Sequence, residues 1–222
     1  MAKFVMKNGS FWISKSAKNL TATAATKGAS TVITATHALA IGDHVYISGS
    51  GWAALDGKVL NVSAVTGTTA FTVDADTAAA TGAFATTAII VPIAKSGLVE
   101  ACLSGFDIES GGNDSISVGT FCDAGAQLAG AGSNGTASIS GFVDPKDPGY
   151  LELVAASADG LPRTFILRLP LAADASGTTH GGEYYMVNAT VGSLSQSFQS
   201  GAAVTFSGSL TLTNKAIFVP AA

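Results

Sequence analysis

The feature that most constrains the fold is the segment from Phe121 to Tyr150, which leads into the one well-marked helix of the sequence. It reads as the end of a strand, a long uncharged Gly/Ala-rich loop (Gly125 to Gly135), a second strand and an Asp/Pro turn. Most of the remaining chain shows the short alternation of apolar and polar residues that is typical of β-strands. Long loops of this kind usually contact something outside their own domain. The segment therefore favours a mainly β protein that assembles with copies of itself.

The helix that follows has clear boundary signals. Asp147 is a favourable N-cap, Pro148 suits the first helical position and Gly160 can end the helix. An apolar stripe with helical spacing predicts the face that packs on a sheet, and its members are Leu151, Val154, Ala155 and Ala158. We therefore expect one packed α-helix among the strands.

Residues 16–92 differ in composition from the rest of the chain, because they are rich in Thr, Ala and Val and contain no glutamate. A turn at residues 66–68 predicts a hairpin between two of the strands expected here. Those strands are Thr31–Thr36, Asp43–Ser48, Lys58–Val65 and Thr69–Asp74. The segment is predicted to be an inserted small all-β domain that projects outward.

The flanking residues, 1–15 and 93–222, are predicted to form one larger antiparallel β-sandwich or partial barrel. Its last strand, Ala203–Thr213, alternates between an apolar face and a polar, wet face. Leu98–Ile108 and Ser115–Cys122 are expected to pair with each other. The other expected strands are Ser10–Ser14, Ala137–Val143, Thr164–Leu169 and Glu183–Leu194.

The charge content is low and unevenly placed. Only 12% of residues are charged, and the net charge is −4. Residues 97–222 contain eleven acidic and four basic residues, a net charge of −7. Such a body repels nucleic acid, and no basic patch with interleaved aromatics is present. Either partner chains cover much of the surface, or Ser, Thr and Ala do; both can hold, and we favour the first.

The N-terminal sequence MAKFVMKNGS lacks the apolar core of a signal peptide, and no apolar run is long enough to span a bilayer. We therefore expect a soluble, cytosolic chain with no membrane insertion. Cys102 and Cys122 are more simply interpreted as free buried thiols than as a disulfide.

Signals for catalysis are weak. His37, His44 and His180 are the histidines available as a base, and each is more simply structural. Residues 130–135 fit GxGxxG, but a strand rather than a helix follows them, so a phosphate site is disfavoured. Asp107 and Glu109 are explained more simply by a solvated strand than by a glycosidase pair. We expect no enzyme activity, no cofactor and no metal.

Taken in order, residues 97–222 resemble the major tail tube protein of long-tailed bacteriophages of the siphophage type. Their order of elements carries the resemblance: a strand pair, an extended loop, a strand ending in an Asp/Pro turn, one helix and three further strands. The corresponding stretches are GLVEACLSGFDIES, SISVGTFCDA, GAQLAGAGSNG, TASISGFVDPKDPGYLELVAASADG, TFILRLPL, EYYMVNATVGSLSQSF and AVTFSGSLTLTN, with SFWIS as the first strand. The segments GDHVYISG, ALDGKVLNV and TAFTVD make the inserted domain similar to β domains of phage tail and fibre proteins.

The resemblance implies a structural virion protein whose hexameric rings stack into a tube that conducts phage DNA. The ring-stacking loop would use Asp123, Gln127, Leu128, Ser133 and Asn134, and the N-terminal arm would use Lys3 and Lys7. The acids facing the channel would be Asp107, Glu109 and Asp114. DNA would pass without specific binding. The implied partners are further copies of the chain, a tape measure protein, a tail terminator and distal tail proteins. Its place would be the virion tail, assembled in the host cytoplasm.

A second hypothesis is a non-enzymatic adhesin or carbohydrate-binding module. Its best feature is Trp52 in the turn GSGWAALDG, because an exposed tryptophan can stack on a sugar. The alternative is that Trp52 fills the core of its own small domain. A β-rich hydrolase is a third hypothesis, without an assembled catalytic set.

Overall fold

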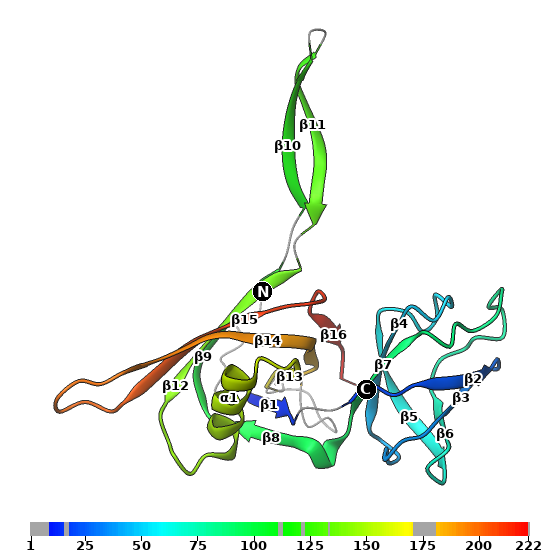
Figure 1. Ribbon diagram of the computed structural model, residues 1–222, viewed down its shortest axis with the longest axis horizontal. Helices are drawn as coiled ribbons and strands as arrows, with labels where there is room; N and C mark the ends of the chain where they lie inside the picture. The colour runs from blue at the N-terminus through cyan, green and yellow to red at the C-terminus, as the bar shows by residue number, and fades with distance from the viewer. Residues whose placement is uncertain are drawn as a thin grey trace.

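The structure is a computed structural model that describes residues 9–15, 18–110, 113–120, 123–132, 134–170 and 181–221. It is mainly antiparallel β-structure with one α-helix, as the sequence predicts (Figure 1). The strands form an eight-stranded sheet, a six-stranded sheet and a separate two-stranded ribbon.

The six-stranded sheet is a small barrel formed within residues 22–93. Its strand order is β2-β3-β6-β5-β4-β7. The strands are β2 (Ala22–Thr26), β3 (Thr31–Ala35), β4 (His44–Ser48), β5 (Lys58–Thr66), β6 (Ala70–Val73) and β7 (Ile89–Ile93). The Leu20 amide, just before β2, donates a 2.8 Å hydrogen bond to the Ile90 carbonyl of β7, so the two edges of this sheet meet. The predicted β5–β6 hairpin is confirmed, whereas β2 and β7 were not predicted.

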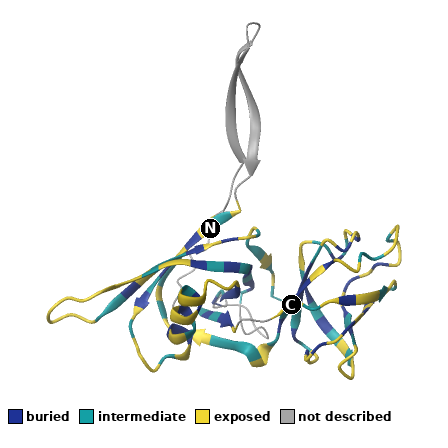
Figure 2. Cartoon of the chain, viewed as in Figure 1, coloured by how far each residue is buried: buried dark blue, intermediate teal, exposed yellow. Residues whose placement is uncertain are grey.

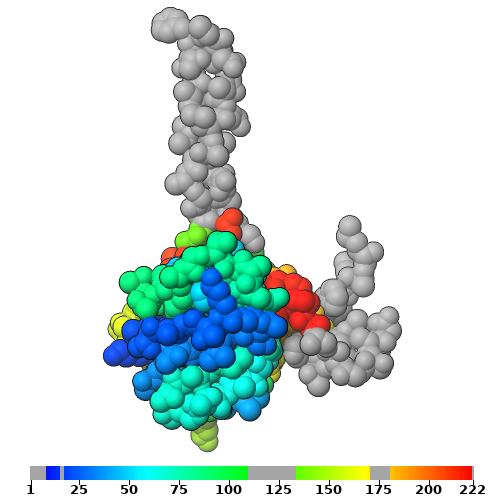
Figure 3. All heavy atoms as spheres, turned by 90° about the vertical axis from the view of Figure 1, so that its right-hand side faces the viewer, coloured from blue at the N-terminus to red at the C-terminus, as the bar shows by residue number. Residues whose placement is uncertain are grey.

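Alternating burial along these strands gives the barrel its own core. Val45, Ile47, Val62 and Phe71 are fully or almost fully buried, while their sequence neighbours on β5 and β6 are partly exposed. Figure 3 views this end of the molecule, where the atoms coloured from blue to cyan, which mostly belong to the barrel, gather in one continuous body. Burying a large apolar side chain contributes about 1.5–3 kcal/mol, so each of these residues stabilises the barrel.

The eight-stranded sheet has the order β8-β1-β13-β14-β15-β12-β9, with β16 paired to β14 as well. Its strands are β1 (Ser10–Ser14), β8 (Leu98–Ala101), β9 (Leu103–Ser110), β12 (Gly135–Phe142), β13 (Arg163–Arg168), β14 (Glu183–Ser197), β15 (Thr205–Thr211) and β16 (Ile217–Val219). A short 3-10 helix, η1 (Lys95–Gly97), precedes β8. The first and last strands in this order, β8 and β9, follow each other directly in the chain. The sheet therefore curls until its two ends meet at Cys102.

The expectation of one strand over Leu98–Ile108 is wrong, because the chain bends at Cys102 between β8 and β9. The Cys102 amide has no strand partner and donates instead to the Asp147 carboxylate at 3.2 Å. The other oxygen of that carboxylate caps the helix, so one aspartate fixes both the bend and the helix start.

The predicted loop over Gly125–Gly135 is also wrong. β11 (Asp123–Gly132) pairs along its length with β10 (Asn113–Thr120), and the resulting ribbon extends away from the sheet (Figure 1). The expected pairing of 98–108 with 115–122 is replaced by two others, β9 with β12 and β10 with β11. A Gly/Ala-rich segment still carries every backbone donor and acceptor, and antiparallel pairing satisfies them without large side chains.

The helix α1 (Pro148–Asp159) begins and ends where the sequence predicts. The Asp147 side chain accepts from the Gly149 amide at 3.0 Å, and Gly160 takes a left-handed conformation with φ of 63°. The predicted packing stripe is wrong, because the buried face consists of Gly149, Tyr150, Leu153 and Ala156. A Cβ atom at Gly149 would lie 2.3 Å from the Glu100 carbonyl oxygen, so close approach of the backbones selects this face. The predicted stripe points to solvent instead.

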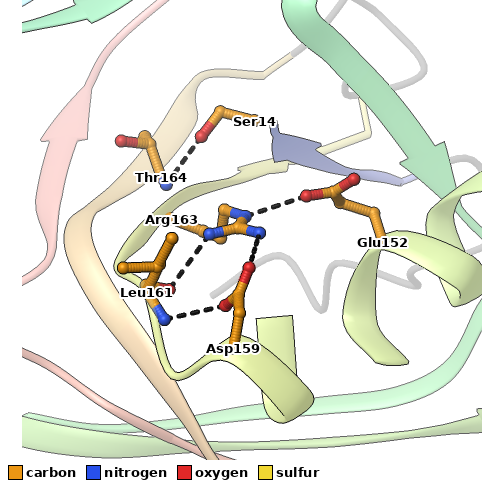
Figure 4. Close-up of polar contacts among 6 residues, drawn as sticks. All are labelled: Ser14, Glu152, Asp159, Leu161, Arg163 and Thr164. Carbon is orange, nitrogen blue, oxygen red and sulfur yellow. Dashed lines mark hydrogen bonds and ion pairs between the residues drawn. The ribbon is translucent and has the colours of Figure 1, made fainter. Parts of the chain in front are cut away.

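Ion pairs from the following strand fix the rotation of the helix. Arg163, with 4% of its side chain exposed, contacts Glu152 and Asp159 at 2.8 Å each (Figure 4). It also donates to the Leu161 carbonyl at 3.2 Å. Hydrogen bonding from Arg163 lowers the pKa of Asp159. A rotation of α1 that buried its outer stripe would break these contacts.

The barrel and the eight-stranded sheet share a third core. Tyr46 and Val91 of the barrel pack with Ile166, Tyr185 and Val187 of β13 and β14. The chain leaves the large sheet after β1 and returns to it before β8 at neighbouring points, because the Lys15 amide donates to the Gly97 carbonyl at 2.9 Å. In chain order, the barrel residues therefore lie between two paired strands, β1 and β8.

A buried polar cluster lies beside this junction. Arg168 contacts the buried Glu183 at 2.5 Å, and the Tyr185 hydroxyl donates to the other oxygen of that carboxylate. Burial raises the pKa of Tyr185 and lowers the pKa of His44, whose ring centroid lies 5.7 Å from that of Tyr185. The cluster joins strands of both sheets, with His44 on β4 and its partners on β13 and β14.

Candidate assembly surface

Four strands of the large sheet are paired in the order β14-β15-β12-β9, and this part of the sheet is called the extension below. β14 contributes only its second half, because a bulge between Val191 and Ser193 separates the stretch paired with β13 from the stretch beyond it. Figure 2 shows this distal half of the β14–β15 hairpin mostly exposed. The tip of this hairpin therefore stands clear of the core, whereas the inner faces of β12 and β15 contribute Ile139 and Leu210 to it.

Both edges of this extension lack a strand partner among the residues that the structure describes. β9 pairs on one side with β12, and no strand pairs with its other side. The distal half of β14 pairs with β15, while its β13-facing side is unpaired beyond Ala189. Unpaired edges of this length are templates for pairing with another chain.

The outer face of the extension carries rows of hydroxyl groups. Ser193 and Ser209 lie 3.0 Å apart, and Ser195 and Ser207 lie 2.9 Å apart, between their hydroxyl oxygens. β12 continues these rows, because Ser138 is opposite Ser209 and Ser140 is opposite Ser207. The polar alternation predicted for residues 203–213 is thus confirmed and shared by the neighbouring strands. No charged residue occurs in 184–214 or in 135–143.

Two of the predicted channel acids lie on β9 at the edge of this face. Asp107 is opposite Ser138 and Glu109 is opposite Thr136, and both acids are exposed. Asp114 belongs to β10, whose side chains lie outside the described residues. The face therefore combines neutral hydroxyl groups with acidic groups, which gives duplex DNA no cationic group to bind.

The predicted stacking residues are only partly brought together. Asp123, Gln127 and Leu128 belong to β11, where they are opposite Thr120, Ser117 and Ile116, and their side chains are outside the described residues. The Asn134 side chain donates to the Thr213 carbonyl at 2.6 Å, so it attaches the base of the ribbon to the end of β15. Ser133, Lys3 and Lys7 also lie outside the described residues.

The proposed sugar-stacking role of Trp52 does not hold. This side chain is 2% exposed and contacts Phe84 edge-on at a centroid distance of 5.4 Å. Its indole N–H finds no acceptor among the described residues. Trp52 therefore fills the barrel core and is not available to stack on a ligand.

No arrangement of reactive groups was found in the described part of the chain. His37 is buried in the barrel, where its ring bonds to the Ala70 carbonyl, and His180 is outside the description. Cys102 is a free thiol, but the prediction that it is buried is wrong, because it lies exposed at the bend between β8 and β9. Partial desolvation and nearby carboxylates raise its pKa, and Cys122 lies outside the described residues. Within those same limits, no group of three or more His, Cys, Asp or Glu residues is placed to hold a metal ion. None of the helices in the described ranges has the length and hydrophobicity of a membrane span.

Comparisons with known proteins give similarity at the level of the fold alone. No protein-family model matches the sequence, and no curated protein matches it significantly. Among solved structures, the chain is similar to one from the cap of the anti-feeding prophage, with 13% identity and a TM-score of 0.42 over 55% of this chain and 82% of that chain. A chain from the sheath–tube complex of an extracellular contractile injection system gives 13% identity, a TM-score of 0.43 and the same coverage.

A chain from the tail of an empty GTA particle, refined with C6 symmetry, is 17% identical, with a TM-score of 0.39 over 63% of this chain and 88% of that chain. At such low TM-scores these similarities do not assign a family or a function to this chain.

Proposed function

We propose that this protein is the repeating structural subunit of a phage-like tail tube, in which the β14-β15-β12-β9 extensions of neighbouring copies join edge to edge. The observation that carries the proposal is the pair of unpaired edges on one hydroxyl-covered sheet. The free side of β9 in one copy would pair with the distal half of β14 in the next. Repeating this contact closes a ring in which the free edges are paired.

In this arrangement residues 1–15 and 93–222 form the tube domain, and residues 16–92 form a barrel on the outside of the tube. The serine rows, Asp107 and Glu109 would line the channel. Because this lining is neutral or acidic, duplex DNA passes without binding. The number six for the ring, and the tape measure, tail terminator and distal tail partners, come from the sequence resemblance to tail tube proteins and belong to the proposal.

The test is electron microscopy of purified protein at increasing concentration, with the expectation of rings or hollow tubes. A variant carrying Ser193→Lys and Ser195→Lys places two charges beside one free edge, and edge lysines oppose strand addition. It should remain folded and fail to form rings. The matched control carries Thr23→Lys and Thr34→Lys on exposed barrel positions and should assemble normally.

A protein that stays monomeric under all concentrations and salts tested would overturn the proposal. So would rings that form equally well in the Ser193→Lys, Ser195→Lys variant. The adhesin hypothesis loses its main support, because Trp52, the residue expected to stack on a sugar, is buried.

A further inference from the structure

The eight-stranded sheet and its helix expose two separate apolar surfaces. Outside the barrel, six large apolar side chains of the described residues are exposed, and five of them gather at two places. Leu151, Val154 and Leu161 lie on α1 and just after it, while Phe142 and Phe198 lie at the distal end of the β14-β15-β12 extension. Clustered exposed apolar groups usually mark interaction surfaces.

The first surface is the outer stripe of α1. Leu151 is 50% exposed, and the smaller Ala155 and Ala158 on the same side are also exposed. The Arg163 ion pairs and the close packing at Gly149 hold this stripe away from the sheet. The stripe itself is uncharged, but the helix and its cap contribute the acids Asp147, Glu152 and Asp159.

The second surface is the turn that begins at Phe198. Phe198 is 72% exposed, the highest exposure among the large apolar side chains described. It follows directly after Ser197 of β14, and the turn that it begins, residues 198–204, contains no charged residue. Since Phe198 and the helix stripe are both exposed in one copy, they do not cover each other there.

We infer that the Phe198 turn of one copy docks on the α1 stripe of a neighbouring copy. The inference rests on the proposed self-assembly and deepens it, because it names the contact that accompanies edge pairing. A single head-to-tail contact of this kind covers both apolar surfaces in every copy of a closed ring. The uncharged turn also suits a helix bordered by acids, where an acidic partner would be repelled.

Cross-linking between two singly substituted proteins tests the contact. Both carry Cys102→Ser and Cys122→Ser; one adds Phe198→Cys and the other adds Val154→Cys, with tags of different size. After co-assembly and treatment with a short bis-maleimide, mixed cross-links should dominate in the assembled fraction. The matched control replaces Val154→Cys with Ile41→Cys, an exposed apolar position on the barrel, and should give no mixed product.

A second measurement gives the contribution of this contact to assembly. Phe198→Ser and Val154→Ser should each raise the protein concentration needed for assembly by about tenfold or more, from the apolar burial that they remove. Ile89→Ser, at an exposed barrel position, should leave it unchanged.

The outcomes are distinguishable. Assembled particles without mixed cross-links, or with cross-links only between two Val154→Cys chains, would overturn this contact and leave the tube proposal standing. Normal assembly of both serine variants would also overturn it. A chain that never assembles would overturn both proposals.

Discussion

The six-stranded barrel and the eight-stranded sheet differ in how the backbone groups of their edge strands find hydrogen-bond partners. The barrel brings its first and last strands together through the hydrogen bond from Leu20 to Ile90, so its edges are satisfied within one chain. The large sheet also curls, but its β14-β15-β12-β9 extension leaves two edges without partners among the described residues. An edge that stays open beside a closed one in the same protein indicates a site for another chain. The contrast supports the proposal that the large sheet, and not the barrel, pairs with further copies of the chain.

The largest expected effect comes from a substitution that destabilises the six-stranded barrel and leaves the large sheet intact. Trp52→Ala removes a buried core side chain and should destabilise the barrel by about 3–5 kcal/mol. Hydrogen exchange should then show lost protection in residues 22–93, while rings still form from the large sheet. Trp52→Phe is the control and should cost less, because it also removes the indole N–H that lacks an acceptor in the described structure. Lost protection in β9 and β12 together with the barrel would show that the two regions do not behave separately.

The second prediction concerns the ion pairs that orient α1. Arg163→Met leaves Glu152 without its partner in a partly buried site and should lower the free energy of unfolding by about 3 kcal/mol. Chemical denaturation measures this loss. Lys58→Met, at an exposed barrel position, should change stability by no more than about 0.5 kcal/mol. Equal stability of both variants would contradict the role of Arg163 in fixing the helix.

A third, smaller effect tests the close approach at Gly149. Gly149→Ala forces a methyl group against the backbone of Glu100 and Ala101, and we expect a loss of about 1–3 kcal/mol in thermal or chemical unfolding. Gly97→Ala, where no atom lies within 4 Å of the added methyl group, should be nearly neutral. If Gly149→Ala is as stable as the wild type, backbone contact does not select the buried face of α1.

The smallest effect is at the junction of the two regions. Burial lowers the pKa of His44 below its ordinary value, so the unfolded chain binds a proton more readily than the folded one. Stability should therefore fall as the pH drops through the ordinary histidine range, and His44→Asn should reduce this dependence. Denaturation at about pH 7.5 and about pH 5.5 measures it. An unchanged slope in the variant would remove His44 from the explanation.

The sequence predicted correctly those features of the fold that depend on residues close together in the chain. The caps of α1 at Asp147 and Gly160 are confirmed because capping depends on adjacent backbone groups. The polar face of β15 is confirmed because strand alternation is fixed by backbone geometry. For the candidate site, this alternation predicted the hydroxyl face of β15, whereas Asp107 and Glu109 were named from the resemblance to tail tube proteins.

Contacts between residues far apart in the sequence determine the features that the sequence analysis did not predict. Two apolar faces compete on α1, and the contact of Gly149 with β8, a non-local event, selects between them. Most of β11 was mistaken for a loop because Gly and Ala give little strand signal, although its backbone pairs with β10, which was predicted as a strand. The open edge of β14 beyond Ala189 depends on where β13 begins, at Arg163, which no residue of β14 encodes.

The bond between Lys15 and Gly97 has a further consequence for how this architecture can change. Because the chain leaves and re-enters the sheet at neighbouring points, excising the barrel needs only a tight turn of about two to five residues to join β1 to β8 as a plain hairpin. Ile166 and Tyr185 would then face water and require polar replacements. With those two replacements, the same position would be a point at which another domain could be joined between β1 and β8.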